Sequence, residues 1–183
     1  MDVLRFKQAN CKNCYKCVRF CPVKSIRVYQ GHAQIISSDC ILCGNCVSVC
    51  PQHAKEDISD VAQIQELIAS GHQVVVSVDS SYIAYFDTPG FAGIAEPLKK
   101  LGFAAAHETA EGAYLVKKEL EKLAAQPGDA PIITSGCSTI VLYVEKPLPE
   151  ALPYLAPVLS PMQAHAVLLR KRYPGVPHFA GKT

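Results

Sequence analysis

Two cysteine-rich stretches decide the interpretation of this chain, CKNCYKCVRFCP at residues 11–22 and CILCGNCVSVCP at residues 40–51. Both have the spacing CxxCxxCxxxCP, and the second copy follows the first at an offset of 29 residues. Eight of the nine cysteines of the 183-residue chain lie in these two stretches. Such a dense grouping with an odd total favours metal binding over a disulfide framework.

The spacing within each stretch indicates what the cysteines bind. Three thiolates at three-residue intervals let one tight loop surround three corners of an iron–sulfur cube, so a distant cysteine must occupy the fourth corner. In two-cluster bacterial ferredoxins the fourth cysteine of each run binds the other cluster. We therefore predict two [4Fe-4S] clusters, the first bound by Cys11, Cys14, Cys17 and Cys50, the second by Cys40, Cys43, Cys46 and Cys21. Zinc held by four cysteines at each site is the alternative, which Pro22 and Pro51 after the fourth cysteines disfavour.

The charge of the first segment fits bound clusters. Residues 1–57 carry eight Lys or Arg against four Asp or Glu, a formal +4. Two oxidised clusters with their thiolates carry about −4, which this excess offsets. The basic residues nearest the cysteines are expected either to tune the clusters or to be ordinary solvated side chains; they are Lys12, Lys16, Arg19 and Lys24.

Composition excludes several classes of protein. With 49% apolar and 19% charged residues the chain is not disordered. Its net charge is +2 and its basic residues are scattered, so we expect no nucleic-acid partner. The apolar stretches are shorter than the roughly 20 residues that a bilayer requires, and the first ten residues lack the apolar core of a signal peptide. We expect a cytoplasmic protein without a membrane partner.

The pattern changes near residue 58, where alternating strands and helices begin. We predict two domains, a two-cluster α+β ferredoxin-like domain over 1–57 and an α/β domain with a parallel sheet over 58–183. In the first we expect a strand pair at 24–29 and 32–37. In the second we expect strands at 73–78, 103–107 and 131–134, and helices at 60–70, 92–101, 109–125, 137–143 and 160–173, with Thr109 and Ser160 as caps.

Three segments of the second domain carry a resemblance to a known family. They are LGFAAAHETAEGAYLV (101–116), ITSGCS (133–138) and PYLAPVLSPMQAH (153–165), the last followed by RYPG (172–175). Together they resemble the C-terminal region of the large subunit of [FeFe]-hydrogenases, carried behind a two-cluster ferredoxin domain. The resemblance implies a truncated α/β hydrogenase-like domain over 58–183, which would leave an open apolar face for association.

The same resemblance singles out Cys137. Where the family has TSCCP, with a proton-relay cysteine before the cysteine that binds the active-site cluster, Thr134, Ser135 and Cys137 match. Gly136 replaces the relay cysteine and Ser138 replaces the proline. Cys137 is therefore a further candidate metal ligand, against the alternative of a small core residue. The other three cysteines of the family's catalytic cluster are not found, so we expect no catalysis from this chain alone.

Other polar residues are weaker candidates. His107, Glu108 and Glu111 surround an expected strand-to-helix turn, where such residues are mostly caps. His165 falls near an apolar helix face, which favours a core histidine over a ligand. A turn is the simplest interpretation of Asp79, Ser80 and Ser81.

The sequence favours one function and leaves two others open. The expected function is one-electron transfer through two [4Fe-4S] clusters to or from a redox partner protein. One alternative is a fragment or half of a hydrogenase-like enzyme or of a hydrogen or redox sensor, completed by another chain. The other is a module that docks a signalling partner through residues 58–183.

Overall fold

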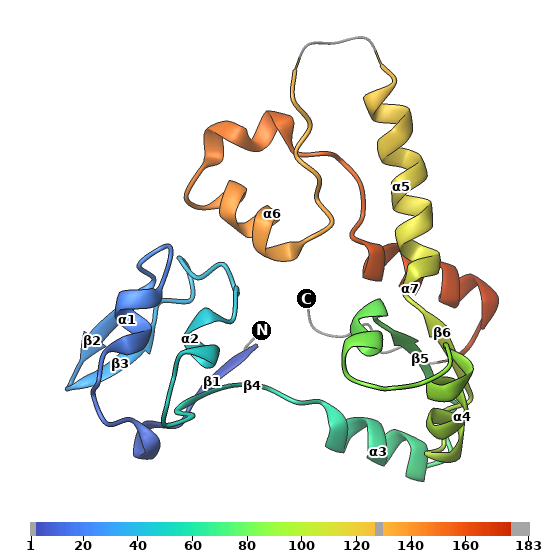
Figure 1. Ribbon diagram of the computed structural model, residues 1–183, viewed down its shortest axis with the longest axis horizontal. Coiled ribbons are helices and arrows are strands. Elements are labelled where there is room, and N and C mark those ends of the chain that lie inside the picture. The colour runs from blue at the N-terminus through green and yellow to red at the C-terminus, as the bar shows by residue number, and fades with distance from the viewer. Residues whose placement is uncertain (1–2, 127–129, 177–183) are drawn as a thin grey trace. The chain divides into compact units, whose positions relative to one another are not determined.

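The computed structural model describes residues 3–126 and 130–176 and shows a mixed α/β chain with small sheets (Figure 1). The chain divides into two compact units. Unit 1 comprises residues 1–59 and 137–155, and unit 2 comprises residues 60–136 and 156–183. The division after Ser59 lies next to the boundary expected near residue 58, whereas residues 137–155, expected in the second domain, group with unit 1.

Unit 1 contains two antiparallel strand pairs. One pair joins β1 (Leu4–Phe6) to β4 (Lys55–Asp57), and the other joins β2 (Ile26–Tyr29) to β3 (His32–Ile35). The two pairs have the same register once the 29-residue offset of the repeat is applied. Strands β1 and β4 pair as Leu4↔Asp57, Arg5↔Glu56 and Phe6↔Lys55. The equivalent residues of β3 and β2 pair as Ala33↔Val28, Gln34↔Arg27 and Ile35↔Ile26. The sequence repeat is therefore also a backbone repeat. Sequence analysis predicted β2 and β3 but not β1 or β4.

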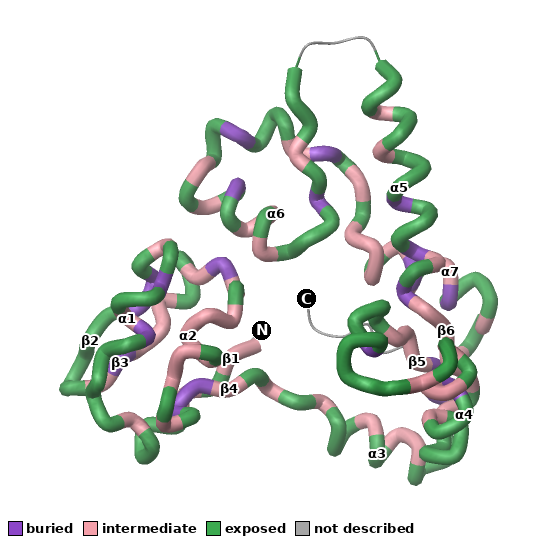
Figure 2. Tube along the Cα trace, viewed as in Figure 1, coloured by how far each residue is buried: buried purple, intermediate pink, exposed green. Residues whose placement is uncertain are grey.

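The cysteine loops repeat in the same way. Each loop leads into a short helix, α1 (Lys16–Phe20) in the first run and α2 (Asn45–Ser48) in the second, with η1 (Gln8–Asn10) before the first loop. Residues with positive φ recur at the 29-residue offset, as Asn13 and Leu42, Tyr15 and Gly44, and Lys24 and His53. Only Gly44 among these has no Cβ to strain in that conformation. Cys17, Cys21, Ile26 and Ala33 form a buried core cluster. Figure 2 colours the buried residues of the chain purple.

A later segment completes unit 1. It consists of α6 (Ser138–Glu145) and the 3₁₀ helix η3 (Pro149–Tyr154). After α6 the Lys146 ammonium donates hydrogen bonds to the carbonyl oxygens of Cys40, at 2.6 Å, and of Ser37, at 3.4 Å. This lysine ties the segment to the second cysteine loop.

Unit 2 is built on two parallel strands, β5 (Val75–Val78) and β6 (Ala105–Glu108). The expected helices form close to their predicted bounds, as α3 (Val61–Ala69), α4 (Ala92–Lys100), α5 (Ala110–Ala124) and α7 (Pro161–Arg172). A 3₁₀ helix, η2 (Ser80–Ala84), follows β5. The capping box of α7 is present, because the Ser160 hydroxyl accepts from Gln163 N and the Gln163 side chain accepts from Ser160 N.

Helices α5 and α7 pack closely because Gly112 has no side chain. A Cβ built on Gly112 would lie 2.7 Å from both the Cβ and the backbone nitrogen of His165. Gly112 and His165 are both buried, so the two helices meet where glycine lets their backbones approach.

Two of the predictions for unit 2 were wrong. Residues 131–134 do not form a strand; the segment holds only an isolated bridge at Ile133, whose carbonyl accepts from Ala156 N. Thr109 precedes α5 as expected, but its hydroxyl does not cap the helix and instead bonds Ser77. The sequence also predicts that Pro127 and Gly128 end the helix over 109–125 and that Pro174 and Pro177 end the helix over 160–173; of these, Pro127, Gly128 and Pro177 lie outside the described residues.

Candidate functional site

Two cavities of unit 1 are lined by cysteines from both runs. One is lined by Cys11, Cys14, Cys17 and Cys50. The other is lined by Cys21, Cys40, Cys43 and Cys46. Their empty spaces, open mouths included, are nearly equal at about 340 and 320 Å³. Each cavity thus takes three cysteines from one run and the fourth from the other, which is the grouping expected from the spacing.

Hydrogen-bond donors also contact several of the cysteine sulfurs that line the cavities. Leu42 N donates to Cys40 Sγ at 3.4 Å, and Ala54 N donates to Cys50 Sγ at 3.3 Å. The buried Ser25 hydroxyl lies 3.4 Å from Cys21 Sγ. Donors of this kind favour the thiolate over the thiol. The donor chemistry of both cavities, four cysteine sulfurs in each, therefore fits iron–sulfur clusters.

Burial and one lysine act in opposite directions on the deepest thiols. Burial raises the pKa of the Cys46 thiol to about 11, and the positive charge of Lys55 opposes that rise. Burial also raises the pKa of the Cys17 thiol, again opposed first by Lys55. Lys55 therefore acts electrostatically on one cysteine of each cavity.

Cys137, the further candidate ligand, is placed apart from these sulfurs. It is exposed at the N-cap position of α6 and makes no side-chain capping bond. It lines neither of the two cysteine cavities. The structure therefore brings eight of the nine cysteines together in two sets and does not bring the ninth to them.

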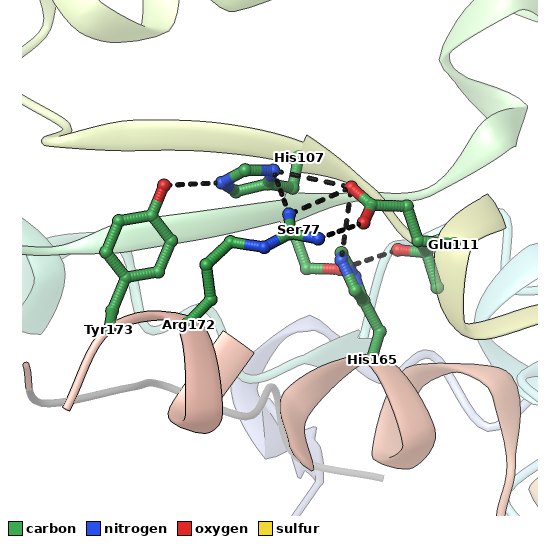
Figure 3. A network of polar contacts seen from close by, with 7 residues as sticks. Ser77, His107, Glu111, His165, Arg172 and Tyr173 are labelled. Atoms are coloured by element: carbon green, nitrogen blue, oxygen red, sulfur yellow. Dashed lines mark hydrogen bonds and ion pairs between the residues drawn. The ribbon is translucent and has the colours of Figure 1, made fainter. Parts of the chain in front are cut away.

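Unit 2 contains a polar cluster that sequence analysis found only in part (Figure 3). His165 is fully buried, and its Nδ1 shares a hydrogen bond with the Ser77 hydroxyl at 2.7 Å. The Ser77 hydroxyl also bonds Thr109 Oγ1 at 2.7 Å. Among the residues that the structure describes, His165 Nε2 has no hydrogen-bond partner, and it lies 4.0 Å from Glu111 Oε1. Burial, opposed by the Glu111 carboxylate, lowers the pKa of His165.

The outer part of this cluster is centred on Arg172. Its guanidinium donates to both oxygens of Glu111, at 2.7 and 3.3 Å, and to His107 Nδ1 at 3.0 Å. Because arginine has no acceptor, His107 accepts at Nδ1 and donates from Nε2 to the Tyr173 hydroxyl at 2.8 Å. The hydrogen bond from Arg172 holds the pKa of the Glu111 carboxyl below its ordinary value.

The remaining candidates have local roles. Glu108 accepts a long hydrogen bond of 3.4 Å from the Tyr82 hydroxyl. Asp79 accepts from Ser81 N at 2.9 Å and so closes the expected turn before η2, while Ser80 is exposed. Sequence analysis missed Ser77, Arg172 and Tyr173, because nothing local in the sequence connects β5 with the end of α7. The 29-residue repeat could have indicated Lys55, since it makes Lys55 equivalent to Ile26, a position expected within a strand.

Two known families match different parts of the chain. Residues 72–178, more than half of its length, match the C-terminal domain of the iron-only hydrogenase large subunit. The chain belongs to this family. Residues 4–51 match a 4Fe-4S dicluster domain, so the chain is an iron–sulfur protein with a hydrogenase-like second part. Both matches confirm the resemblance and the order of the two parts.

Individual relatives match parts of the chain. A component of the ion-translocating oxidoreductase complex of Methanosarcina acetivorans is 42% identical over 55 residues, which are 30% of this chain and 21% of that protein. The cytosolic Fe-S cluster assembly factor NAR1 of Candida dubliniensis is 26% identical over 150 residues, 75% of this chain and 26% of the relative. A solved [FeFe]-hydrogenase structure aligns with a TM-score of 0.50 and 25% identity, over 65% of this chain and 36% of that one.

The chain covers only part of the length of these relatives. The hydrogenase-like chain spans between 21% and 36% of the proteins it matches. The family matches support an iron–sulfur, hydrogenase-like role. Within the described residues, no helix combines the length and the apolar character needed to cross a membrane.

Proposed function

We propose that this chain carries single electrons through two [4Fe-4S] clusters bound in the two cysteine cavities of unit 1. The observation that carries the proposal is the lining of the cavities, three cysteines from one run and one from the other in each. The 4Fe-4S dicluster match over residues 4–51 supports it independently of the geometry.

The residues of the chain have separate tasks in this function. The eight thiolates hold the clusters, and the crossed fourth cysteines, Cys21 and Cys50, join the two halves of the repeat. The amides of Leu42 and Ala54 donate to Cys40 and Cys50 and stabilise their negative charge. Each bound cluster supplies one-electron redox chemistry at a potential that these ligands and donors set.

The first experiment measures the number of clusters. Iron and acid-labile sulfide are determined on protein purified anaerobically, with low-temperature EPR after reduction with dithionite. We expect about eight irons per chain and the broadened spectrum of two coupled clusters. Zinc in place of iron, or about four irons, would contradict the proposal.

A pair of double variants tests the crossed assignment. In Cys14→Ala/Cys50→Ala both lost cysteines belong to one set, so about four irons should remain. In Cys14→Ala/Cys21→Ala, the matched control, the lost cysteines belong to different sets and both clusters should be lost. If each run bound its own cluster, the two variants would give the opposite results. Alanine is used because a serine oxygen can still bind iron.

The family match over residues 72–178 favours a second candidate, a hydrogenase-like metal site in the later part of the chain. Cys137 is the residue that would bind it, because it is the one cysteine outside the two runs. Clearly more than about eight irons, with an EPR signal that disappears in Cys137→Ala, would support this candidate. An iron content unchanged in Cys137→Ala would contradict it.

A carrier of single electrons also needs a partner that accepts or donates them. We propose a redox partner protein, as the names of the oxidoreductase complex and the hydrogenase suggest for those relatives. The test is single-turnover reoxidation of the dithionite-reduced protein by candidate partners. The proposal fails if reduced protein reacts only with small oxidants.

A further inference from the structure

Lys55 breaks the internal repeat at one buried position. The register of the strand pairs makes Lys55, which faces Phe6, equivalent to Ile26, which faces Ile35. Both residues are buried, with 2% of Lys55 and 6% of Ile26 exposed. One half of the repeat therefore places an apolar side chain where the other half places an ammonium group.

The neighbours of the Lys55 ammonium are neutral. Its Nζ donates to the Ala33 carbonyl oxygen at 2.8 Å and lies 4.2 Å from the centre of the Phe6 ring. The adjacent Glu56 pairs instead with Lys7, at 2.6 Å. Among the described residues, none of the ion pairs includes Lys55.

An isolated buried ammonium is costly, which indicates that a negative partner is present in the working protein. A carbonyl and an aromatic face each offset part of the lost hydration, but a buried charge is normally paired. Lys55 lines the same cavity as Cys11, Cys14, Cys17 and Cys50. The groups able to supply the negative charge are thus the thiolates that the lysine faces.

Lys55 also acts on the second set of cysteines. Burial raises the pKa of Cys17, of the first set, and of Cys46, of the second, and the charge of Lys55 opposes both rises. Strand β4, which carries Lys55, also contacts α2, the helix that carries Cys46 of the second set. Lys12 and Lys16 line the same first cavity as Lys55 but differ from it because they are exposed.

We propose that Lys55 is a buried counter-cation shared by both clusters, and that it raises both reduction potentials. The inference rests on the proposed function, since it requires a cluster in each cavity. Reduction adds one electron, and hence one negative charge, to each four-thiolate cluster. A cation held in a region of low dielectric favours the more negative, reduced state of both.

The test is a redox titration of the full chain with dithionite, followed by EPR, together with iron analysis. Lys55→Met removes the charge and keeps a side chain of similar length, and Ile26 shows that the equivalent position accepts an apolar residue. We expect wild-type iron content and both midpoint potentials shifted to more negative values. Lys55→Arg restores the charge and should return both potentials toward those of the wild type.

Lys7→Met is the matched control, at the residue directly after the facing strand β1. It also removes one positive charge, but Lys7 is 46% exposed and already paired with Glu56. We expect a smaller shift, abolished at high ionic strength, whereas the shift in Lys55→Met should persist because buried charges are poorly screened.

The outcomes distinguish a failure of the proposed electron-transfer function from a failure of the role proposed for Lys55. A wild-type protein without iron contradicts the proposed function. A fully loaded Lys55→Met with unchanged potentials, or with only one shifted, overturns the shared role of Lys55. If Lys55→Met loses iron, Lys55→Ile and Lys55→Arg are compared. Iron retained only with arginine supports the need for charge, and iron lost with arginine as well overturns it.

Discussion

Ser77 joins the buried end of the polar cluster, because its single hydroxyl contacts both Thr109 and His165. Ser77→Ala removes both hydrogen bonds and leaves His165, already without a partner at Nε2, without one at Nδ1. We expect the free energy of unfolding to fall by about 1–3 kcal/mol, measured by urea denaturation. Ser80→Ala, at an exposed site two residues after β5, should change it by less than about 0.5 kcal/mol. Equal effects of the two substitutions would show that the cluster contributes nothing to stability.

Because the pKa of His165 is lowered in the folded chain, the stability of the chain should fall as the pH decreases. Burial lowers its pKa in the folded chain, so the unfolded chain binds a proton there first as the pH falls below about 6.5. The free energy of unfolding should therefore decrease between about pH 6.5 and 5, above the range in which Glu111 titrates. Denaturation at a series of pH values measures this slope.

Two variants identify the residue responsible for that slope. His165→Asn keeps a polar atom near Ser77 but cannot titrate, so it should flatten the slope even though it lowers stability at every pH. His72→Gln, at an exposed histidine of the same unit, should leave the slope in place. A slope unchanged in His165→Asn contradicts the assignment.

At the scale of elements, Gly112 decides how closely α5 and α7 pack. Helix propensity alone predicts that Gly112→Ala stabilises α5 by about 0.8–1.0 kcal/mol. The new methyl group would instead press on Pro161 and His165, so we expect a loss of about 1–3 kcal/mol or more by denaturation. Gly136→Ala is the control, because its Cβ would first meet Pro161 Cδ at 3.8 Å, an ordinary contact. Stabilisation by Gly112→Ala would mean that the helices separate readily.

Local signals explain which elements sequence analysis predicted. Helix α7 was predicted because Ser160, Pro161 and Gln163 are a capping signal contained in four residues. Strand β4 was missed because the charged residues Lys55, Glu56 and Asp57 do not resemble a strand. Strand β4 forms because it pairs with β1, in the same register in which β2 pairs with β3. Residues 131–134 have a strand-like composition but in the structure form only a single bridge.

The same difference between local signals and long-range contacts applies to the candidate sites. The grouping of eight cysteines could be predicted because a repeated spacing encodes it, and ligation itself stays a prediction. The pairing of Glu111 with Arg172 could not be predicted, since the two residues are 61 positions apart and meet only once α7 packs on α5. The role proposed for Lys55 needs the strand register, which no single stretch of sequence shows.

At the scale of the whole molecule, the two units differ in what holds them together. The buried cluster of Cys17, Cys21, Ile26 and Ala33 in unit 1 is half made of proposed cluster ligands. A unit of this size buries too little apolar surface to be strongly stable without a staple. Unit 2 has its own packing of α5 on α7 and a parallel strand pair that involve no cysteine.

Removal of iron should therefore unfold one unit and spare the other. The holoprotein and protein treated anaerobically with a chelator and ferricyanide are compared by hydrogen–deuterium exchange. We expect the amides of β2 and β4 to lose protection, because the iron that cross-links the two cysteine runs is gone. The amides of β5 and β6 should keep their protection and serve as the internal control. Retained protection in β2 and β4 would show that unit 1 folds without its clusters, and equal loss in all four strands would show that the two units unfold together.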